Sequence, residues 1–106
     1  MGIKKSAPIK FQQRKRVFVD KIFVESDDTI SWEAHDSDLA IFVPEASVLF
    51  GSTERIFDVP KGQSIELKVV DKPSQGEHRY YYYAIYHKNV RDFAESNSNP
   101  VIIVQG

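Results

Sequence analysis

The 106-residue sequence has no cysteine. The protein therefore forms no disulfide bond, offers no thiolate nucleophile and cannot hold a metal or an iron–sulfur cluster through thiolates. No apolar run approaches the roughly eighteen residues of a membrane-spanning helix, so we expect no membrane partner. The N-terminus also lacks the apolar core of a signal peptide. We expect a cytoplasmic protein if this is the native N-terminus, and a periplasmic or secreted one if a leader was removed.

Catalytic and phosphate-binding motifs are also missing. The sequence has no Gly-x-Ser-x-Gly elbow, no glycine-rich phosphate loop and no His-Glu-x-x-His pair. His78 lies between Glu77 and Arg79, an arrangement that favours a surface residue over a catalytic base. We therefore predict that the protein is not an enzyme and binds no cofactor.

Charge is unevenly distributed along a chain whose net charge is −1. The first sixteen residues carry six basic residues and no acidic one, whereas the rest of the chain carries 8 basic and 15 acidic residues. The six are Lys4, Lys5, Lys10, Arg14, Lys15 and Arg16. A basic segment on an acidic body attracts anions, and Arg14 and Arg16 are candidates for contacting a partner. Because the acidic body repels phosphate, we do not expect nucleic acid as the partner.

Short apolar segments separated by turns make up most of the remaining chain. Ile30 and Trp32 alternate with polar residues, which predicts a strand with Trp32 buried. The segment 64–70 alternates as well, with Ile65, Leu67 and Val69 on its inner side. No segment keeps a helical period over three turns. We predict an all-β, antiparallel β-sandwich of seven or eight strands in residues 9–106, preceded by a flexible basic arm in residues 1–8.

All five tyrosines lie in the segment 76–87, which predicts a central strand. Alternation places Tyr80 and Tyr82 on one face, and we expect that face to be the inner one. Tyr81 and Tyr83 then lie on the outer face. They form either an exposed patch for a partner or a face covered by the polar excursion of residues 87–99.

The order of these features resembles the cupredoxin, or blue-copper, family between residues 23 and 104. Val24–Trp32 is similar to the family's first apolar strand, turn and V-x-W strand, although Asp27 stands where glycine is usual. Phe57–Ser64 is similar to its F-x-V-x-x-G-x-S stretch. The resemblance implies an eight-stranded Greek-key sandwich. An immunoglobulin-like or fibronectin-like sandwich is the alternative.

The family's copper ligands are mostly absent from this sequence. The resemblance implies a histidine about eight residues after the tryptophan strand, where the chain reads Leu39-Ala40-Ile41. It also implies a cysteine at Ala84, three residues before the one ligand that remains, His87. Because type 1 copper needs a thiolate, the residues exclude that centre.

Three hypotheses about function follow. The leading one is a copper-free binding or structural module with a protein partner. The second is a divergent metal-binding protein, in which imidazole and carboxylate ligands suit zinc or copper(II). Its candidate ligands are His35, Asp36, Asp38 and His87. The third is an anion or nucleic-acid binder that works through the basic segment.

Overall fold

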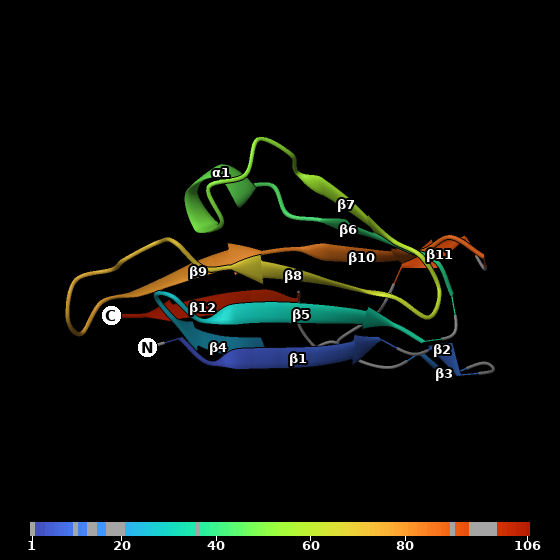
Figure 1. Ribbon diagram of the computed structural model, residues 1–106, viewed down its shortest axis with the longest axis horizontal. Helices are drawn as coiled ribbons and strands as arrows, with labels where there is room; N and C mark the ends of the chain where they lie inside the picture. The colour runs from blue at the N-terminus through green and yellow to red at the C-terminus, as the bar shows by residue number, and fades with distance from the viewer. Residues whose placement is uncertain are drawn as a thin grey trace.

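The computed structural model is an elongated, mostly β structure with one short helix in its described part, α1 (Ala46–Leu49) (Figure 1). It describes residues 2–9, 11–12, 15–16, 21–35, 37–89, 91–93 and 100–106. No helix within these residues has the length and apolar character needed to cross a membrane. The all-β class predicted from the sequence is confirmed.

The described residues form twelve strands. In chain order they are β1 (Lys4–Ile9), β2 (Phe11–Gln12), β3 (Lys15–Arg16), β4 (Lys21–Glu25), β5 (Thr29–Ala34), β6 (Leu39–Phe42), β7 (Ile56–Val59), β8 (Ser64–Lys68), β9 (His78–Tyr82), β10 (Ala84–His87), β11 (Asp92–Phe93) and β12 (Val101–Gln105). Three of them have only two residues, and β9 and β10 are interrupted only at Tyr83. Eight extended runs remain, which agrees with the seven or eight expected.

Three sheets build the sandwich. Sheet I has the strand order β1-β5-β8, sheet II the order β4-β12-β9 and sheet III the order β11-β10-β6-β7. Most neighbours are antiparallel, but β1 runs parallel to β5 and β4 runs parallel to β12. The run formed by β9 and β10 joins two sheets, because β9 pairs with β12 and β10 pairs with β6.

Trp32 lies in the core between the sheets. Its side chain is fully buried, as predicted, and its ring centroid lies 5.5 Å from that of Tyr83 and 6.2 Å from that of Phe50. Inner residues of all three sheets belong to the same apolar cluster, including Ile30 of sheet I, Ile102 of sheet II and Ile85 of sheet III. The predicted inner side of β8 is also confirmed, with Val69 fully buried and Ile65 and Leu67 half-buried.

The N-terminal segment differs from its prediction. Residues 1–8 were expected to form a flexible arm, but Lys4–Ile9 form β1 at the edge of sheet I, paired in register with Thr29–Ala34. The polar composition concealed this strand, because edge strands tolerate lysine and proline that a central strand would not. The chain continues with the short strands β2 and β3, which pair with one another, and residues 17–19 lie outside the described residues.

Asp28 fixes the start of β1 against the sandwich. Its carboxylate is 4% exposed and accepts hydrogen bonds from the backbone N–H groups of Ile3 and Glu25, each at 2.8 Å. Asp27, in the turn predicted at this point, has a φ of 74°, a left-handed conformation that glycine and aspartate adopt more readily than most residues. One buried carboxylate thus joins the N-terminal strand to the end of β4.

Candidate functional site

The tyrosine strand has the predicted alternation but the opposite orientation. Tyr81 and Tyr83 are each 4% exposed, whereas Tyr80 is 56% and Tyr82 is 59% exposed. The prediction that Tyr80 and Tyr82 point inward, and that Tyr81 and Tyr83 lie on the outer face, is therefore wrong. Alternation assigns residues to two faces, but the position of the opposing sheet decides which face is inside, and Tyr83 lies on the side that contacts Trp32.

The outer side of sheet II carries a cluster of exposed aromatic residues. The ladder places Ile103 between Phe23 and Tyr80, and Val101 beside Tyr82. Phe23 is 50% exposed, whereas Val101 and Ile103 are buried and lie outside the central apolar cluster. We call Phe23, Tyr80, Tyr82, Val101 and Ile103 the aromatic face. Its rim is formed by the outer-side residues Lys21, Glu25, His78 and Gln105.

The inner side of β9 is held by a partly buried polar cluster, in which Tyr81 and Asp71 are buried and Arg79 is 43% exposed. The phenol of Tyr81 donates a hydrogen bond to Oδ2 of Asp71, and Nη1 of Arg79 lies 2.7 Å from Oδ1 of the same carboxylate. Burial, together with the hydrogen bond to Asp71, raises the pKa of Tyr81 to about 12. Asp71 is 7% exposed and comes soon after β8. These contacts fix β9 from within, so its outer tyrosines stand on a positioned strand.

Three of the four candidate metal ligands, His35, Asp38 and His87, lie in the described residues, and these three form no common site. His87 is 1% exposed and lies on the inner side of β10, opposite Leu39 in the ladder. Asp38 uses Oδ1 to accept the backbone N–H of Lys61 at 2.7 Å. Asp36 lies outside the described residues. Within the described ranges, no three histidine, aspartate or glutamate side chains are grouped closely enough to hold a metal ion.

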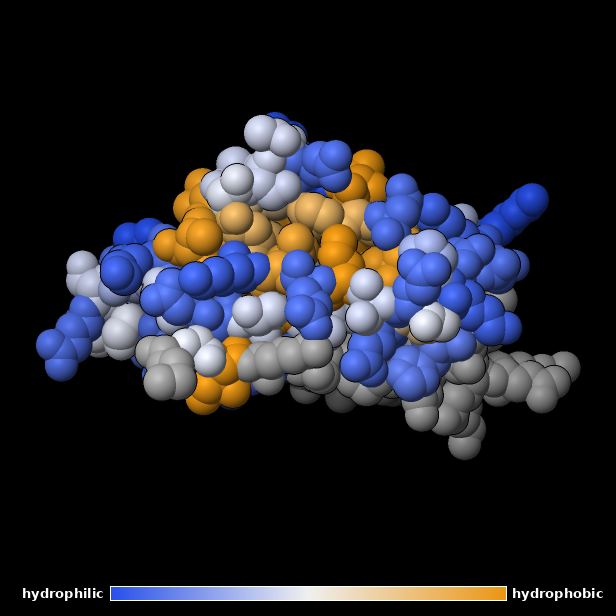
Figure 2. All heavy atoms as spheres, viewed as in Figure 1, coloured by the Kyte–Doolittle hydropathy of each residue, from blue (hydrophilic) through white to orange (hydrophobic). Residues whose placement is uncertain are grey.

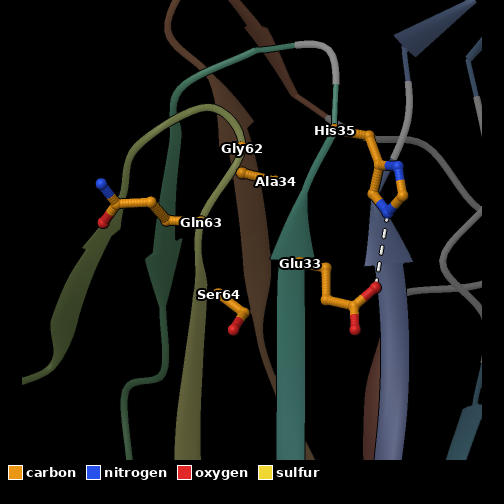
Figure 3. A pocket seen from close by; sticks show the side chains of 6 residues that line it. All are labelled: Glu33, Ala34, His35, Gly62, Gln63 and Ser64. Carbon is orange, nitrogen blue, oxygen red and sulfur yellow. Dashed lines mark hydrogen bonds and ion pairs between the residues drawn. The ribbon is translucent and has the colours of Figure 1, made fainter.

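His35 instead lines an open pocket of about 460 Å³ (Figure 3). Its Nε2 lies 3.4 Å from Oε2 of Glu33, and Figure 3 shows the two side chains pointing toward one another while Gln63 extends away from them. Gly62 closes the pocket with a φ of 83° and donates its N–H to the carbonyl of Ala34. One imidazole and one carboxylate supply only two of the three or four protein ligands that zinc usually has.

The basic residues near the N-terminus do not form a described site with the tyrosines. Arg14 lies outside the described residues, and Arg16 lies in β3 with no description of its side chain. Tyr81 and Tyr83 are buried and so present no stacking surface to these arginines. Sequence reasoning missed the residues that are exposed, Phe23, Tyr80 and Tyr82. The alternation of the tyrosines along β9 would have identified Tyr80 and Tyr82, had the inner and outer faces of the strand been assigned the other way round.

A second apolar surface lies elsewhere. Figure 2 shows hydrophobic residues gathered between α1, β7 and β8. Exposed aliphatic residues on or beside these elements are Val48, Ile56 and Val70, at 50%, 58% and 49%. They come from a helix, a strand and a loop, whereas the aromatic face is a regular ladder on a single sheet.

No protein-family model, curated protein or solved structure matches this chain. The resemblance to cupredoxins therefore depends on the residues quoted above.

Proposed function

We propose that this chain is a copper-free, cupredoxin-like Greek-key sandwich that acts as a binding module for a protein partner, through the aromatic face. The observation that carries the proposal is the exposure of Phe23, Tyr80 and Tyr82 together on the outer side of sheet II. Most of the remaining large aromatic side chains whose burial is known are packed inside.

The size of the face supports a partner. A fully buried aromatic side chain covers about 150–250 Å². Three side chains that are half exposed or slightly more therefore leave roughly 250–400 Å² of aromatic surface in contact with water. This area approaches the 300–600 Å² or so of the largest patch on a typical monomer, which often has a function. Tyrosine is favoured in interfaces because it is rigid and offers both an apolar ring and a hydroxyl.

The charges of the rim favour protein over nucleic acid. One lysine, Lys21, and one glutamate, Glu25, lie at opposite ends of β4 and cancel formally. Nucleic acid gains most of its affinity from cations that neutralise phosphates, and this rim provides no excess of them. A polar rim around an apolar centre is the usual composition of a protein interface.

The ligand positions support a module without type 1 copper. Ala84 stands in β10 where the family resemblance implies cysteine, and the methyl side chain of alanine has no donor atom for copper. The retained histidine, His87, is buried at 1% exposure on the inner side of the strand.

Site-specific photocrosslinking tests the proposal. A photoreactive phenylalanine analogue replaces Tyr82, on the aromatic face, and in a control variant the same analogue replaces exposed Glu54. Both variants are crosslinked in the cells that naturally produce the protein. We expect a discrete protein adduct at position 82 that is absent at position 54, and that is lost when Tyr80 is also changed to serine. Equal adducts at both positions, or none at position 82, would contradict the proposal. An adduct with nucleic acid would favour the third hypothesis instead.

A further inference from the structure

The hydrogen bonds at the two ends of β9 show which way its backbone groups point. The N–H of Tyr83 donates to the carbonyl of Pro100 at 3.1 Å, and the N–H of Gly106 donates to the carbonyl of Glu77 at 2.8 Å. In an antiparallel pair, hydrogen-bonded and non-hydrogen-bonded positions alternate. Between these two bonds, Arg79 and Tyr81 therefore point their backbone N–H and C=O groups toward β12. His78, Tyr80 and Tyr82 point theirs to the opposite edge of β9.

The run formed by β9 and β10 has a second edge, on the side away from β12. In the described part of the chain, this edge is paired with β6 along β10 and has no partner strand along β9. The N–H of Lys88 donates to the carbonyl of Asp38 at 2.9 Å, so the even-numbered residues of β10 direct their backbone groups toward β6. Continued by one step, this ladder would place Tyr82 opposite Pro44, because Ala84 pairs with Phe42. Proline has no N–H to donate, and there the chain leaves the sheet toward α1.

Three consecutive even-numbered residues of β9 are therefore left at an open edge. In the described part of the chain, no strand pairs with this edge, and no residue provides a hydrogen-bond partner for the backbone groups of His78, Tyr80 or Tyr82. The strand on the other side of β12, β4, has a side chain bonded to its backbone at its end, because the carboxylate of Asp28 accepts the N–H of Glu25. Among the described residues, no side chain hydrogen-bonds the edge of β9 in the same way.

We propose that this open edge of β9 binds an extended peptide segment of a partner protein by strand addition. This inference rests on the proposed function, because it names how a protein partner would reach the aromatic face. The edge favours an extended peptide as the ligand, because the backbone donors and acceptors of another strand have the same spacing as those of β9. The added strand would continue the line of β6, which already occupies the same edge along β10.

The aromatic face indicates the side chains that the peptide should carry. Tyr80 and Tyr82 present both their backbone groups to the edge and their rings to the outer side of the sheet. A strand beside them places alternate side chains next to these rings, where aromatic and β-branched residues form favourable cross-strand pairs. The expected ligand is a segment of about five residues with aromatic or β-branched residues at alternate positions.

Amide hydrogen exchange of the free protein tests the geometry first. The amides of Tyr80 and Tyr82 should exchange rapidly, and those of Arg79 and Tyr81 slowly. Only the amides of Arg79 and Tyr81 donate hydrogen bonds toward β12. Equal protection of all four amides would mean that the edge is already covered, and the inference would be wrong.

A displayed library of random nine-residue peptides, selected against the whole protein, then supplies a probe. We expect selected peptides to alternate as described, and the synthetic consensus peptide to slow exchange at His78, Tyr80 and Tyr82. Failure to enrich any peptide, or a peptide that leaves those amides unprotected, would overturn strand addition. In the second case the proposed function would stand if the peptide shifted the resonances of the tyrosine rings.

Tyr80→Pro and Tyr80→Ala form a matched pair for the consensus peptide. Both remove the ring, but only proline removes the N–H that faces the edge, and proline is tolerated at an edge strand where that N–H is not used. We expect Tyr80→Ala to bind a few-fold more weakly than the unchanged protein, and Tyr80→Pro at least tenfold more weakly than Tyr80→Ala. Equal affinities for the two variants would contradict strand addition. If Tyr80→Pro does not fold, His78→Pro against His78→Ala repeats the comparison at the start of the strand.

Discussion

Tyr82 and Tyr83 are neighbours in the chain with opposite environments. Tyr82 is 59% exposed on the aromatic face, and Tyr83 is 4% exposed with its ring centroid 5.5 Å from that of Trp32. The same residue type thus builds the core on one side of a strand and a candidate interface on the other. The difference shows that aromatic composition identifies the strand, whereas the position of the opposing sheet decides which side has which role.

The largest expected effect is the difference in stability between truncating Tyr83 and truncating Tyr82. Tyr83→Ala should lower the free energy of unfolding by about 3–5 kcal/mol, as large aromatic truncations in cores do. Tyr82→Ala should change it by less than about 1 kcal/mol, because the side chain is mostly in water. Urea-induced unfolding measures both values. Similar losses for the two variants would mean that the strand is not divided into a core side and an exposed side.

Trp32→Ala should cost about as much as Tyr83→Ala, again about 3–5 kcal/mol. Because the two rings are in contact, their effects should not be additive, and a double-mutant cycle should give a coupling of about 0.5–1.5 kcal/mol for an aromatic pair. Additive losses would show that the rings do not contact one another in solution.

A smaller effect is expected from removing single hydroxyl groups on the two sides of β9. Tyr81→Phe should cost about 1–3 kcal/mol, because it leaves the buried carboxylate of Asp71 without its phenol donor. Tyr80→Phe should be close to neutral, because the exposed hydroxyl that it removes contacts water in both the folded and the unfolded protein. A neutral Tyr81→Phe would indicate that Arg79 alone satisfies Asp71.

The same pair of variants should differ in its dependence on alkaline pH. The pKa of Tyr81 is raised to about 12 in the folded protein, above the value near 10 of an unfolded chain. The protonated phenol therefore stabilises the fold fully below about pH 10, and this stabilisation is lost as the pH rises through 12. The stability difference between the unchanged protein and Tyr81→Phe should shrink as the pH rises from about 10 to about 12. A constant difference would contradict the assignment, and Tyr80→Phe provides the control.

The smallest effect on stability should come from the double variant Tyr80→Ser, Tyr82→Ser. We expect a change within about 1 kcal/mol, because neither side chain supports the core. The adduct formed by the photoreactive analogue at position 82 should nevertheless disappear when Tyr80 is changed to serine. A large loss of stability would assign the aromatic face to folding and weaken the proposed function.

The sequence was sufficient for features that depend on local pattern. Trp32, the alternation of residues 64–70 and the strand at the tyrosines were all recognisable, because hydrophobic periodicity reports directly on strands. It was not sufficient for β1, whose lysines and proline resemble a loop and which is specified by pairing with β5, a segment about 25 residues away in the chain. The site was missed for a related reason, since the inner side of Tyr81 depends on contacts with Asp71 and with the opposing sheet.

The central place of β12 has a consequence for how the molecule folds. β12 lies between β4 and β9 in sheet II, although nearly eighty residues separate its sequence from that of β4. Neither of its neighbours has a partner in that sheet until Val101–Gln105 has been synthesised, and Ile102 and Val104 then complete the core. Pairing over such long sequence separations makes folding slow. During synthesis, the unpaired edges of β4 and β9 expose the chain to aggregation until β12 is inserted between them.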